Sequence, residues 1–325
     1  MLRVVPATGS RLIPALNILY EALPVDERST RVAESAQATA AGELDLSLLL
    51  LAELHGKPVG ALLLRMQPSE VAFVWAPIVS GDLANVAASL SAKHAAVSSE
   101  MIEDALLQAA VQSIEESNAW IGQSLLELPQ LRERAAFSRN GFRHLTNLRF
   151  FECPVATDHD TVAPITGELK DQRNYIAYRR TRNRLRFANV IEQTYRGSLD
   201  CPEMNGIRSA SQSLKVYEAS GPVIPDMWRV YCHEKNDVGV ILMVDHSEQN
   251  TWEVIYLGVV ESARRQGIAR DMLTKAMQAA RAAQVERLLI VVDSRNLPAV
   301  RLYESLGFTQ FDIRAAYVRL APAGQ

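Results

Sequence analysis

Hydrophobic positions in the last third of the chain change period in a regular order. Residues 251–260 form an apolar stretch, and residues 287–292 form a run without polar alternation, which is typical of a strand covered on both faces. Between them, apolar residues recur at helical spacing: Ala269, Met272, Leu273, Ala276, Met277 and Ala280. A second helix is predicted over 297–305, because Asn296 can cap it, Pro298 suits its first turn and Gly307 can end it. A final strand is expected to run through Val318.

Earlier parts of the chain contain similar segments. In the first half, strands and one helix are expected at residues 48–54, 60–66, 71–79 and 101–114. In the second half, a strand, a helix and a hairpin are expected at residues 174–178, 182–195, 227–233 and 238–246. Strands that alternate with helices predict an α/β fold class, with mixed sheets flanked by helices.

A short cationic turn, Arg264-Arg265-Gln266-Gly267-Ile268-Ala269, joins the strand at 251–260 to the next helix. The first N–H groups of a helix have no partner within it and carry a partial positive charge. Gly267 lacks the Cβ that would hold an anion away from the backbone. The turn therefore predicts a phosphate site. Arg264, Arg265 and Arg270 are candidates for bidentate phosphate contacts, and solvated surface charge is the alternative for one or two of them.

This turn resembles the pyrophosphate loop of the GNAT superfamily of acyl-CoA-dependent N-acyltransferases, Q/R-x-x-G-x-G/A, with Arg264, Gly267 and Ala269 at its three defined positions. The following helix resembles a second GNAT signature, N-x-x-A-x-x-L-Y-x-x-x-G-F, at Asn296, Ala299, Leu302, Tyr303, Gly307 and Phe308. The resemblance implies acetyl-CoA as co-substrate, without a metal. It also implies cofactor contacts at Leu257, Gly258, Val259, Arg264, Arg265, Gln266, Gly267, Ile268, Ala269, Arg270 and Asn296.

An internal comparison indicates a duplication. Residues 134–142 mirror residues 300–308 at a constant offset, and both segments end in Gly-Phe before a strand. The same offset places residues 98–103, which contain neither glycine nor arginine, opposite the cationic turn, and Phe137 opposite Tyr303.

We therefore expect two tandem GNAT-like domains, similar in layout to the mycothiol synthase family. Residues 1–157 are expected to form a degenerate copy without a cofactor loop, and residues 158–325 the active copy. The polar segment 158–167 is the expected linker. An unrelated N-terminal α/β domain is the alternative.

Two side chains are candidates for the chemistry that the resemblance implies. Glu253 resembles the family position of a general base, and strand alternation would place it on one apolar face with Ile255, Leu257 and Val259, where desolvation raises a carboxyl pKa. A rim carboxylate paired with an arginine is the alternative. Tyr303 resembles the family tyrosine that donates a proton to the departing thiolate, and a packed core tyrosine is its alternative.

Residues 194–205 correspond to one wall of the acceptor cleft in this superfamily. Tyr195, Asp200, Glu203 and Asn205 are the candidate acceptor contacts, because an acidic residue can hold a cationic amine. A structural loop with a helix cap at Asp200 explains the same residues. Cys201 is a poor candidate nucleophile, since no histidine is close in sequence and direct transfer needs none.

Composition narrows the remaining function classes. The 325 residues suit two domains, and a formal net charge of −3 gives no global attraction for nucleic acid. The arginine run at 179–186 is more typical of a solvated helix face than of a nucleic-acid site. No apolar run reaches the length of a membrane span. Three cysteines without metal spacing favour a reduced, cytoplasmic protein.

The expected function is acetyl transfer from acetyl-CoA to a primary amine of a small molecule or peptide, with no nucleic-acid or membrane partner. The oligomeric state is left open. A non-catalytic acyl-CoA-binding sensor is the alternative, and the presence of both Glu253 and Tyr303 argues against it, because binding alone needs neither residue.

Overall fold

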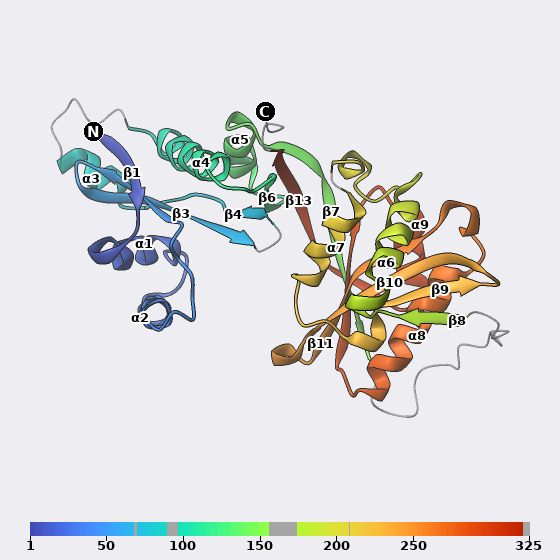
Figure 1. Cartoon of the computed structure of the whole chain (residues 1–325). Coiled ribbons are helices and arrows are strands. Elements are labelled where there is room, and N and C mark those ends of the chain that lie inside the picture. The colour runs from blue at the N-terminus through green and yellow to red at the C-terminus, as the bar shows by residue number, and fades with distance from the viewer. Residues whose placement is uncertain (68–69, 90–96, 156–173, 208, 321–325) are drawn as a thin grey trace. The chain divides into compact units, whose positions relative to one another are not determined.

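The computed structural model describes residues 1–67, 70–89, 97–155, 174–207 and 209–320. The chain divides into two compact units (Figure 1). Unit 1 comprises Met1–Leu145 and Ala315–Gln325, and unit 2 comprises Thr146–Arg314. Two strands, β7 (Arg143–Pro154) and β13 (Thr309–Leu320), contribute residues to both units. The expected linker at 158–167 and the expected boundary after residue 157 lie outside the described residues.

Unit 1 contains a mixed sheet with the strand order β1-β2-β3-β4-β6-β13, and β5 pairs with β3. The remaining strands of the unit are β1 (Leu2–Pro6), β2 (Leu49–Leu54), β3 (Lys57–Gln67), β4 (Val71–Val74), β5 (Ile78–Val79) and β6 (Ile121–Glu127). Its helices are α1 (Leu12–Leu19), α2 (Val25–Ala40), α3 (Leu83–Ser89), α4 (Ser99–Glu115) and α5 (Leu131–Arg139). Strands β4 and β6 pair in parallel, whereas β1, β2, β3 and β4 are joined by antiparallel pairs.

In unit 2 the strand order is β13-β7-β12-β11-β10-β9-β8, and the strand pairing is again mixed. The strands not yet given are β8 (Asn174–Ala177), β9 (Arg229–His233), β10 (Asn236–His246), β11 (Thr251–Val259) and β12 (Arg287–Asp293). Its helices are α6 (Arg180–Tyr195), α7 (Ala210–Glu218), α8 (Ile268–Ala282) and α9 (Leu297–Ser305). Strands β11 and β12 pair in parallel, and β12 pairs antiparallel with β7.

The order of elements in the two units is the same. Each unit has a strand, two helices, three strands, a helix, a strand, a helix and a last strand, and unit 1 adds β5 and α3 before α4. The two Gly-Phe pairs also match, because Gly141 and Gly307 both have positive φ at the end of a helix, at 81° and 88°. The predicted α/β class, with mixed strand pairing flanked by helices in each unit, is therefore confirmed.

Most of the expected elements are present. The strands and helices predicted in unit 2 correspond to β8 through β13 and to α6, α8 and α9, with ends shifted by a few residues. The strand expected at 71–79 is wrong as one element, because the chain leaves the sheet after Val74 and returns as β5. The pattern at 71–79 shows only that the segment is apolar, and Pro77 cannot donate to a sheet hydrogen bond within it.

Helices cover both faces of the unit 2 sheet. A Cβ on Gly258 of β11 would meet Thr194 of α6, and a Cβ on Gly239 of β10 would meet Met272 of α8. Glycine at these two positions thus lets each helix approach the sheet closely. The core between the layers includes the fully buried Trp228, whose indole N–H donates to the Met243 carbonyl at 2.7 Å.

Candidate functional site

The two parallel strands at the centre of unit 2 separate partway along their length. β11 pairs with β12 only from Thr251 to Val254. At that point β11 also bulges against β10, because the register steps from Met243 opposite Val254 to Leu242 opposite Tyr256 and leaves Ile255 as an extra residue. Beyond the bulge, the side of β11 that faces β12 has no strand partner in the described part of the chain.

A cavity of about 900 Å³ lies at this separation. Its wall includes every residue of β11 from Val254 to Val259, together with Ile290 and Val291 of β12. Three further segments complete the wall: the turn before α8, the first part of α9, and the loop after α6 with α7. All of these segments belong to unit 2.

The turn before α8, called the cradle below, has the backbone geometry that the sequence predicts. Arg265 and Gly267 have positive φ, at 62° and 77°, and the first backbone hydrogen bond of α8 runs from the Asp271 N–H to the Gly267 carbonyl at 3.0 Å. Within the described part of the chain, the N–H groups of Gly267, Ile268, Ala269 and Arg270 donate to no protein acceptor. These four residues line the cavity, so the unpaired donors and the helix dipole meet at one end of it.

The Arg264 side chain has a different role from the phosphate contact that its sequence position indicates. Its guanidinium donates to the carbonyls of Val259, Thr194, Arg196 and Gly197. These bonds join the turn to the last turn of α6, so the side chain holds the cradle in place. Arg265 and Arg270 remain the candidates for phosphate contact, because both are exposed and line the cavity.

Gln266 does not line the cavity, although its backbone belongs to the cradle. Its side-chain amide donates to the Ser262 carbonyl at 3.2 Å. Arg270 also has a partner of its own, since its guanidinium donates to the Ser305 hydroxyl at 2.6 Å. The contact that the sequence predicts for Gln266 is therefore limited to its main chain.

Helix α9 carries the second predicted group. The Asn296 side chain accepts the Ala299 N–H at 3.3 Å, which confirms it as the cap, and it also lines the cavity. Tyr303 lies about two turns later, is 5% exposed and packs its ring against Phe151 and Phe308. Burial, with a smaller contribution from the charge of Asp200, raises the pKa of Tyr303, so its hydroxyl stays protonated at neutral pH.

Glu253 lies on a different face of β11 from the one expected. Because Ile255 is an extra residue, Glu253 opposite Val244 shares its face with Tyr256 opposite Leu242. The expectation that Glu253 shares a face with Leu257 and Val259 is therefore wrong. Glu253 does not line the cavity, and its Oε2 is 2.8 Å from His246 Nε2. Its role as a base stays a prediction.

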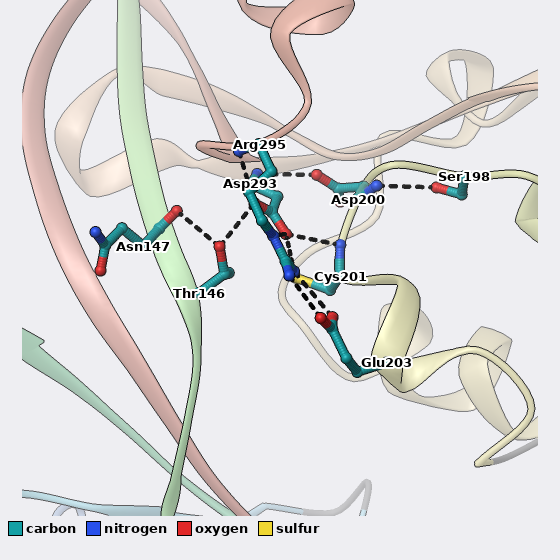
Figure 2. Close-up of polar contacts among 8 residues, drawn as sticks. All are labelled: Thr146, Asn147, Ser198, Asp200, Cys201, Glu203, Asp293 and Arg295. Atoms are coloured by element: carbon teal, nitrogen blue, oxygen red, sulfur yellow. Dashed lines mark hydrogen bonds and ion pairs between the residues drawn. The ribbon is translucent and has the colours of Figure 1, made fainter.

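A network of charged groups fixes the loop after α6 (Figure 2). Asp293, at the end of β12, is fully buried, and its carboxylate accepts from the Arg295 side chain at 2.7 Å, Thr146 Oγ1 at 2.7 Å and the Cys201 N–H at 3.0 Å. Burial acts to raise the pKa of Asp293, but these hydrogen bonds outweigh it and hold the pKa below its usual value.

Glu203 belongs to this network and does not line the cavity. Its carboxylate accepts two hydrogen bonds from the Arg295 guanidinium, at 2.5 and 2.8 Å, and they hold the pKa of Glu203 below its usual value. Of the four predicted acceptor contacts, Tyr195, Asp200 and Asn205 do line the cavity. The structure thus brings three of the four together and ties Glu203 to an arginine.

Asp200 and Cys201 are adjacent in the cavity wall. Asp200 Oδ1 accepts the Asp293 N–H at 2.9 Å, and desolvation together with the charge of Asp293 raises the pKa of Asp200. Asp200 is exposed as a residue, but its carboxyl group is desolvated by the surrounding protein. Burial, followed by the charges of Asp200 and Asp293, also raises the pKa of Cys201, so the nucleophilic thiolate is disfavoured.

Two tyrosines of the cavity wall are missed by sequence reasoning. Tyr256 donates or accepts a hydrogen bond with Thr194 Oγ1 at 2.6 Å, and its ring lies 5.1 Å from that of Tyr217 and 6.1 Å from that of Tyr195. Tyr217 belongs to α7, which was not predicted. Ser209 and Gln212 form a capping box at the start of α7, so the S-x-x-Q pattern is the signal that identifies this helix.

Unit 1 has no comparable cradle at the start of α4. The Ser98 side chain caps this helix by accepting the Met101 N–H at 3.2 Å, and Glu100 adds a negative charge in the first turn. Phe137, opposite Tyr303 in the internal comparison, is fully buried in the unit 1 core. The cap and the acidic residue disfavour an anionic ligand at the start of α4, and Phe137 has no hydroxyl that could take the place of Tyr303.

The described residues contain neither a metal-binding cluster nor a membrane-spanning helix. No group of three or more His, Cys, Asp or Glu side chains there is arranged to hold a metal ion. No helix in the described ranges is long and apolar enough to cross a membrane.

Comparison with known proteins gives a consistent family. Residues 210–308 match the model described as the acetyltransferase (GNAT) family. A mycothiol acetyltransferase of Streptosporangium roseum is 32% identical over 72 residues, which are 22% of this chain and 21% of that protein. One of Beutenbergia cavernae is 36% identical over 109 residues, which are 33% of this chain and 36% of that protein. The chain thus matches only about a fifth to a third of these relatives' length.

Solved structures support the fold. A GCN5-related N-acetyltransferase from Sphaerobacter thermophilus has a TM-score of 0.57 at 14% identity, covering 100% of this chain and 96% of that one. A tandem GNAT protein from the clavulanic acid biosynthesis pathway has a TM-score of 0.50 at 12% identity, covering 100% and 99%. At these identities the likeness concerns the fold alone.

Proposed function

We propose, from the match of residues 210–308 to the GNAT acetyltransferase family and from the cavity of unit 2, that this chain transfers the acetyl group of acetyl-CoA directly to a primary amine of a small molecule or peptide. The observation that carries the proposal is the cavity of unit 2, where one end has four unpaired N–H donors at the start of α8 and another part of the wall has Tyr303. Acetyl-CoA carries both a diphosphate, which the N–H donors suit, and a thioester, whose departing sulfur Tyr303 can protonate, so a single cavity has to offer both features.

The cavity offers a complementary partner for each part of acetyl-CoA. The N–H groups from Gly267 to Arg270 suit the pyrophosphate, because they are unpaired donors at a positive helix end. The free side of β11 offers the backbone of Leu257, Gly258 and Val259 to the amide groups of the pantetheine arm. Asn296 is available to the same arm. Acetyl-CoA is a substrate of the proposed reaction, and no metal is required by it.

The reaction requires a neutral amine and a protonated leaving group. An amine with a lysine-like pKa of about 10.4 is neutral in only about one molecule in 2500 at pH 7, so a nearby base is valuable. Glu253 and Asp200 are the two carboxylates proposed for this role. Tyr303 is proposed to donate its hydroxyl proton to the sulfur, since burial keeps that hydroxyl protonated.

The names of the relatives do not identify the amine that this chain acetylates. The family match begins at residue 210, after the loop at 196–205 that forms part of the cavity wall. The residues expected to recognise the amine thus lie outside the matched segment. We keep the cytoplasm as the proposed location, which agrees with the free thiols of Cys153, Cys201 and Cys232.

The function is tested by incubating the protein with acetyl-CoA and a panel of primary amines, amino sugars and peptides. Release of free thiol together with formation of the acetylated amine is the expected result. If acetyl-CoA binds and no amine in a broad panel is acetylated, the non-catalytic sensor becomes the better explanation. If acetyl-CoA does not bind, both functions fail.

Tyr303→Phe is expected to lower kcat about tenfold and to leave the dissociation constant of acetyl-CoA unchanged. This loss is smaller than the 100-fold or larger rate factor that is typical of general acid catalysis. A thiol with a pKa of about 8.5 is a good leaving group, so its sulfur needs only partial protonation to leave. Thiol release and calorimetry measure the two quantities. An unchanged kcat with the best amine of the panel would withdraw the proton-donor role.

A further inference from the structure

One carboxylate stands apart among the described residues that line the cavity. Asp200 is the single acidic side chain in that wall, which it shares with Tyr303 and Asn296. We propose that Asp200 holds the ammonium group of the acceptor and takes its first proton before the nitrogen attacks the thioester. This inference rests on the proposed acetyl transfer and names the residue that selects and activates the amine.

Asp200 is held in one position by the surrounding backbone. Its Oδ1 accepts the Asp293 N–H at 2.9 Å, and its own N–H donates to Ser198 Oγ at 3.1 Å (Figure 2). The neighbouring Asn296 side chain acts to lower the pKa of Asp200, against the larger effect of desolvation. A carboxylate offers about four lone-pair positions, so these bonds leave acceptor capacity for an ammonium group.

The loop that carries Asp200 is itself fixed to the end of β12. The next residue, Cys201, donates its N–H to Asp293 Oδ2 at 3.0 Å. Two residues further on, Glu203 makes its two hydrogen bonds with Arg295. Asp200 is therefore a preorganised group, because neither its carboxylate nor its loop has to be ordered by the acceptor.

The charges around Asp200 favour a cation. Asp293, Glu203 and Asp200 provide three carboxylates, against one guanidinium from Arg295. The titratable neighbours Cys201, Tyr256 and Tyr303 all have raised pKa values and are neutral at pH 7. An ammonium group supplies the missing positive charge, and the same surroundings raise the pKa of Asp200 toward the range of an effective base.

Glu253 is less well placed for this role. It does not line the cavity, and one of its oxygens is already 2.8 Å from the His246 ring nitrogen. The bulge at Ile255 places it on the face of β11 that also carries Tyr256, but Tyr256 lines the cavity and Glu253 does not. A proton would therefore have to reach Glu253 through intervening groups, whereas Asp200 lies in the wall.

The proton and electron balance of the step is complete with these groups. The ammonium gives one proton to Asp200, and the nitrogen lone pair then forms the C–N bond to the acetyl carbon. The C–S bond breaks, and the sulfur leaves with the electron pair and takes the Tyr303 hydroxyl proton. The second proton of the acylated nitrogen restores Tyr303, and Asp200 releases its proton to solvent. One amide and one free thiol are formed.

Benzylamine and aniline are the probes that separate a base from a structural residue. Both carry a ring that can pack against Tyr195, Tyr217 and Tyr256 in the wall. Benzylamine is an ammonium at pH 7, whereas aniline is neutral and needs no initial deprotonation. A variant that lacks the base should therefore lose activity with the first amine only.

The test compares wild-type protein with Asp200→Asn and Glu253→Gln. We expect Asp200→Asn to lower kcat/KM for benzylamine about 100-fold and to change kcat/KM for aniline less than about threefold. The wild-type rate with benzylamine should also fall as the pH drops through the raised pKa of Asp200. This acidic limb of the pH–rate profile should be absent in Asp200→Asn. In Glu253→Gln the fall in rate at low pH should persist, because Asp200 lines the cavity and Glu253 does not.

Each other outcome overturns the inference. Equal loss with both amines means that Asp200 is only structural, and no loss with either amine means that it has no role. A 100-fold loss confined to Glu253→Gln returns the base to Glu253. Calorimetry with acetyl-CoA separates these results from failure of the proposed function. If the wild-type protein neither binds acetyl-CoA nor acetylates any amine, the proposed acetyl transfer itself is wrong.

Discussion

Gly267→Glu is expected to abolish binding of acetyl-CoA, with the dissociation constant raised at least about 100-fold. Gly267 has φ of +77°, and a Cβ added there would meet no atom within 4 Å, so the new side chain would enter the cavity. Its carboxylate would stand at the positive end of α8, where the phosphates are expected, and would both occupy and neutralise the cradle. Calorimetry with coenzyme A measures the effect.

Gly42→Glu is the matched control. Gly42 has φ of +74° and also has nothing within 4 Å of an added Cβ, but it belongs to unit 1. The two variants therefore carry similar backbone strain and the same added charge. We expect coenzyme A to bind Gly42→Glu as it binds the wild type. Similar affinities for the two variants would show that the cradle before α8 is not the diphosphate site.

The cradle could be predicted from the sequence because its parts are adjacent in the chain. A strand, a glycine turn and a helix start within one segment determine where the free N–H groups of residues 267–270 point. The cap at Asn296 and the Tyr303 helix are equally local, since each depends on residues within about three turns. Local backbone chemistry was therefore sufficient to place both ends of the proposed acetyl-CoA site.

The acceptor side could not be predicted in the same way, because it depends on contacts between distant segments. The extra residue at Ile255 changes the face of Glu253, and nothing in the residues of β11 marks the bulge. The Arg264 side chain faces carbonyls of the α6 end, about 70 positions earlier in the chain. Glu203 is paired with Arg295, which lies 92 positions later. Charge patterns alone do not identify such partners.

Arg295→Met is expected to lower the free energy of unfolding of unit 2 by about 3 kcal/mol at pH 7. The substitution leaves the carboxylate of Asp293, which is 0% exposed, without its cation. Removing one partner of a buried ion pair destabilises a protein by about 3–5 kcal/mol. We expect the lower value, because the Arg295 side chain itself is 43% exposed and partly screened by water. Denaturant unfolding or the shift in Tm measures the loss.

Arg287→Met is the control for this effect. The Arg287 side chain is 47% exposed, close to Arg295, but its partner Glu152 is 31% exposed. A carboxylate that stays hydrated tolerates the loss of an arginine partner, so we expect the free energy of unfolding to fall by less than about 1 kcal/mol. Equal losses in the two variants would show that burial of Asp293 does not control the cost.

The pH dependence of the Arg295→Met deficit tests its electrostatic origin. In the wild type, the pKa of Asp293 is lowered by folding, so its contribution to stability is present above the unfolded value of about 3.9 and is lost as the pH falls through the folded value. In Arg295→Met, burial without a cation raises the pKa of Asp293, and protonation relieves the buried charge. The deficit should therefore be largest at neutral pH and shrink on acidification. A deficit that stayed constant between pH 7 and pH 4 would point to lost packing of the arginine stem instead.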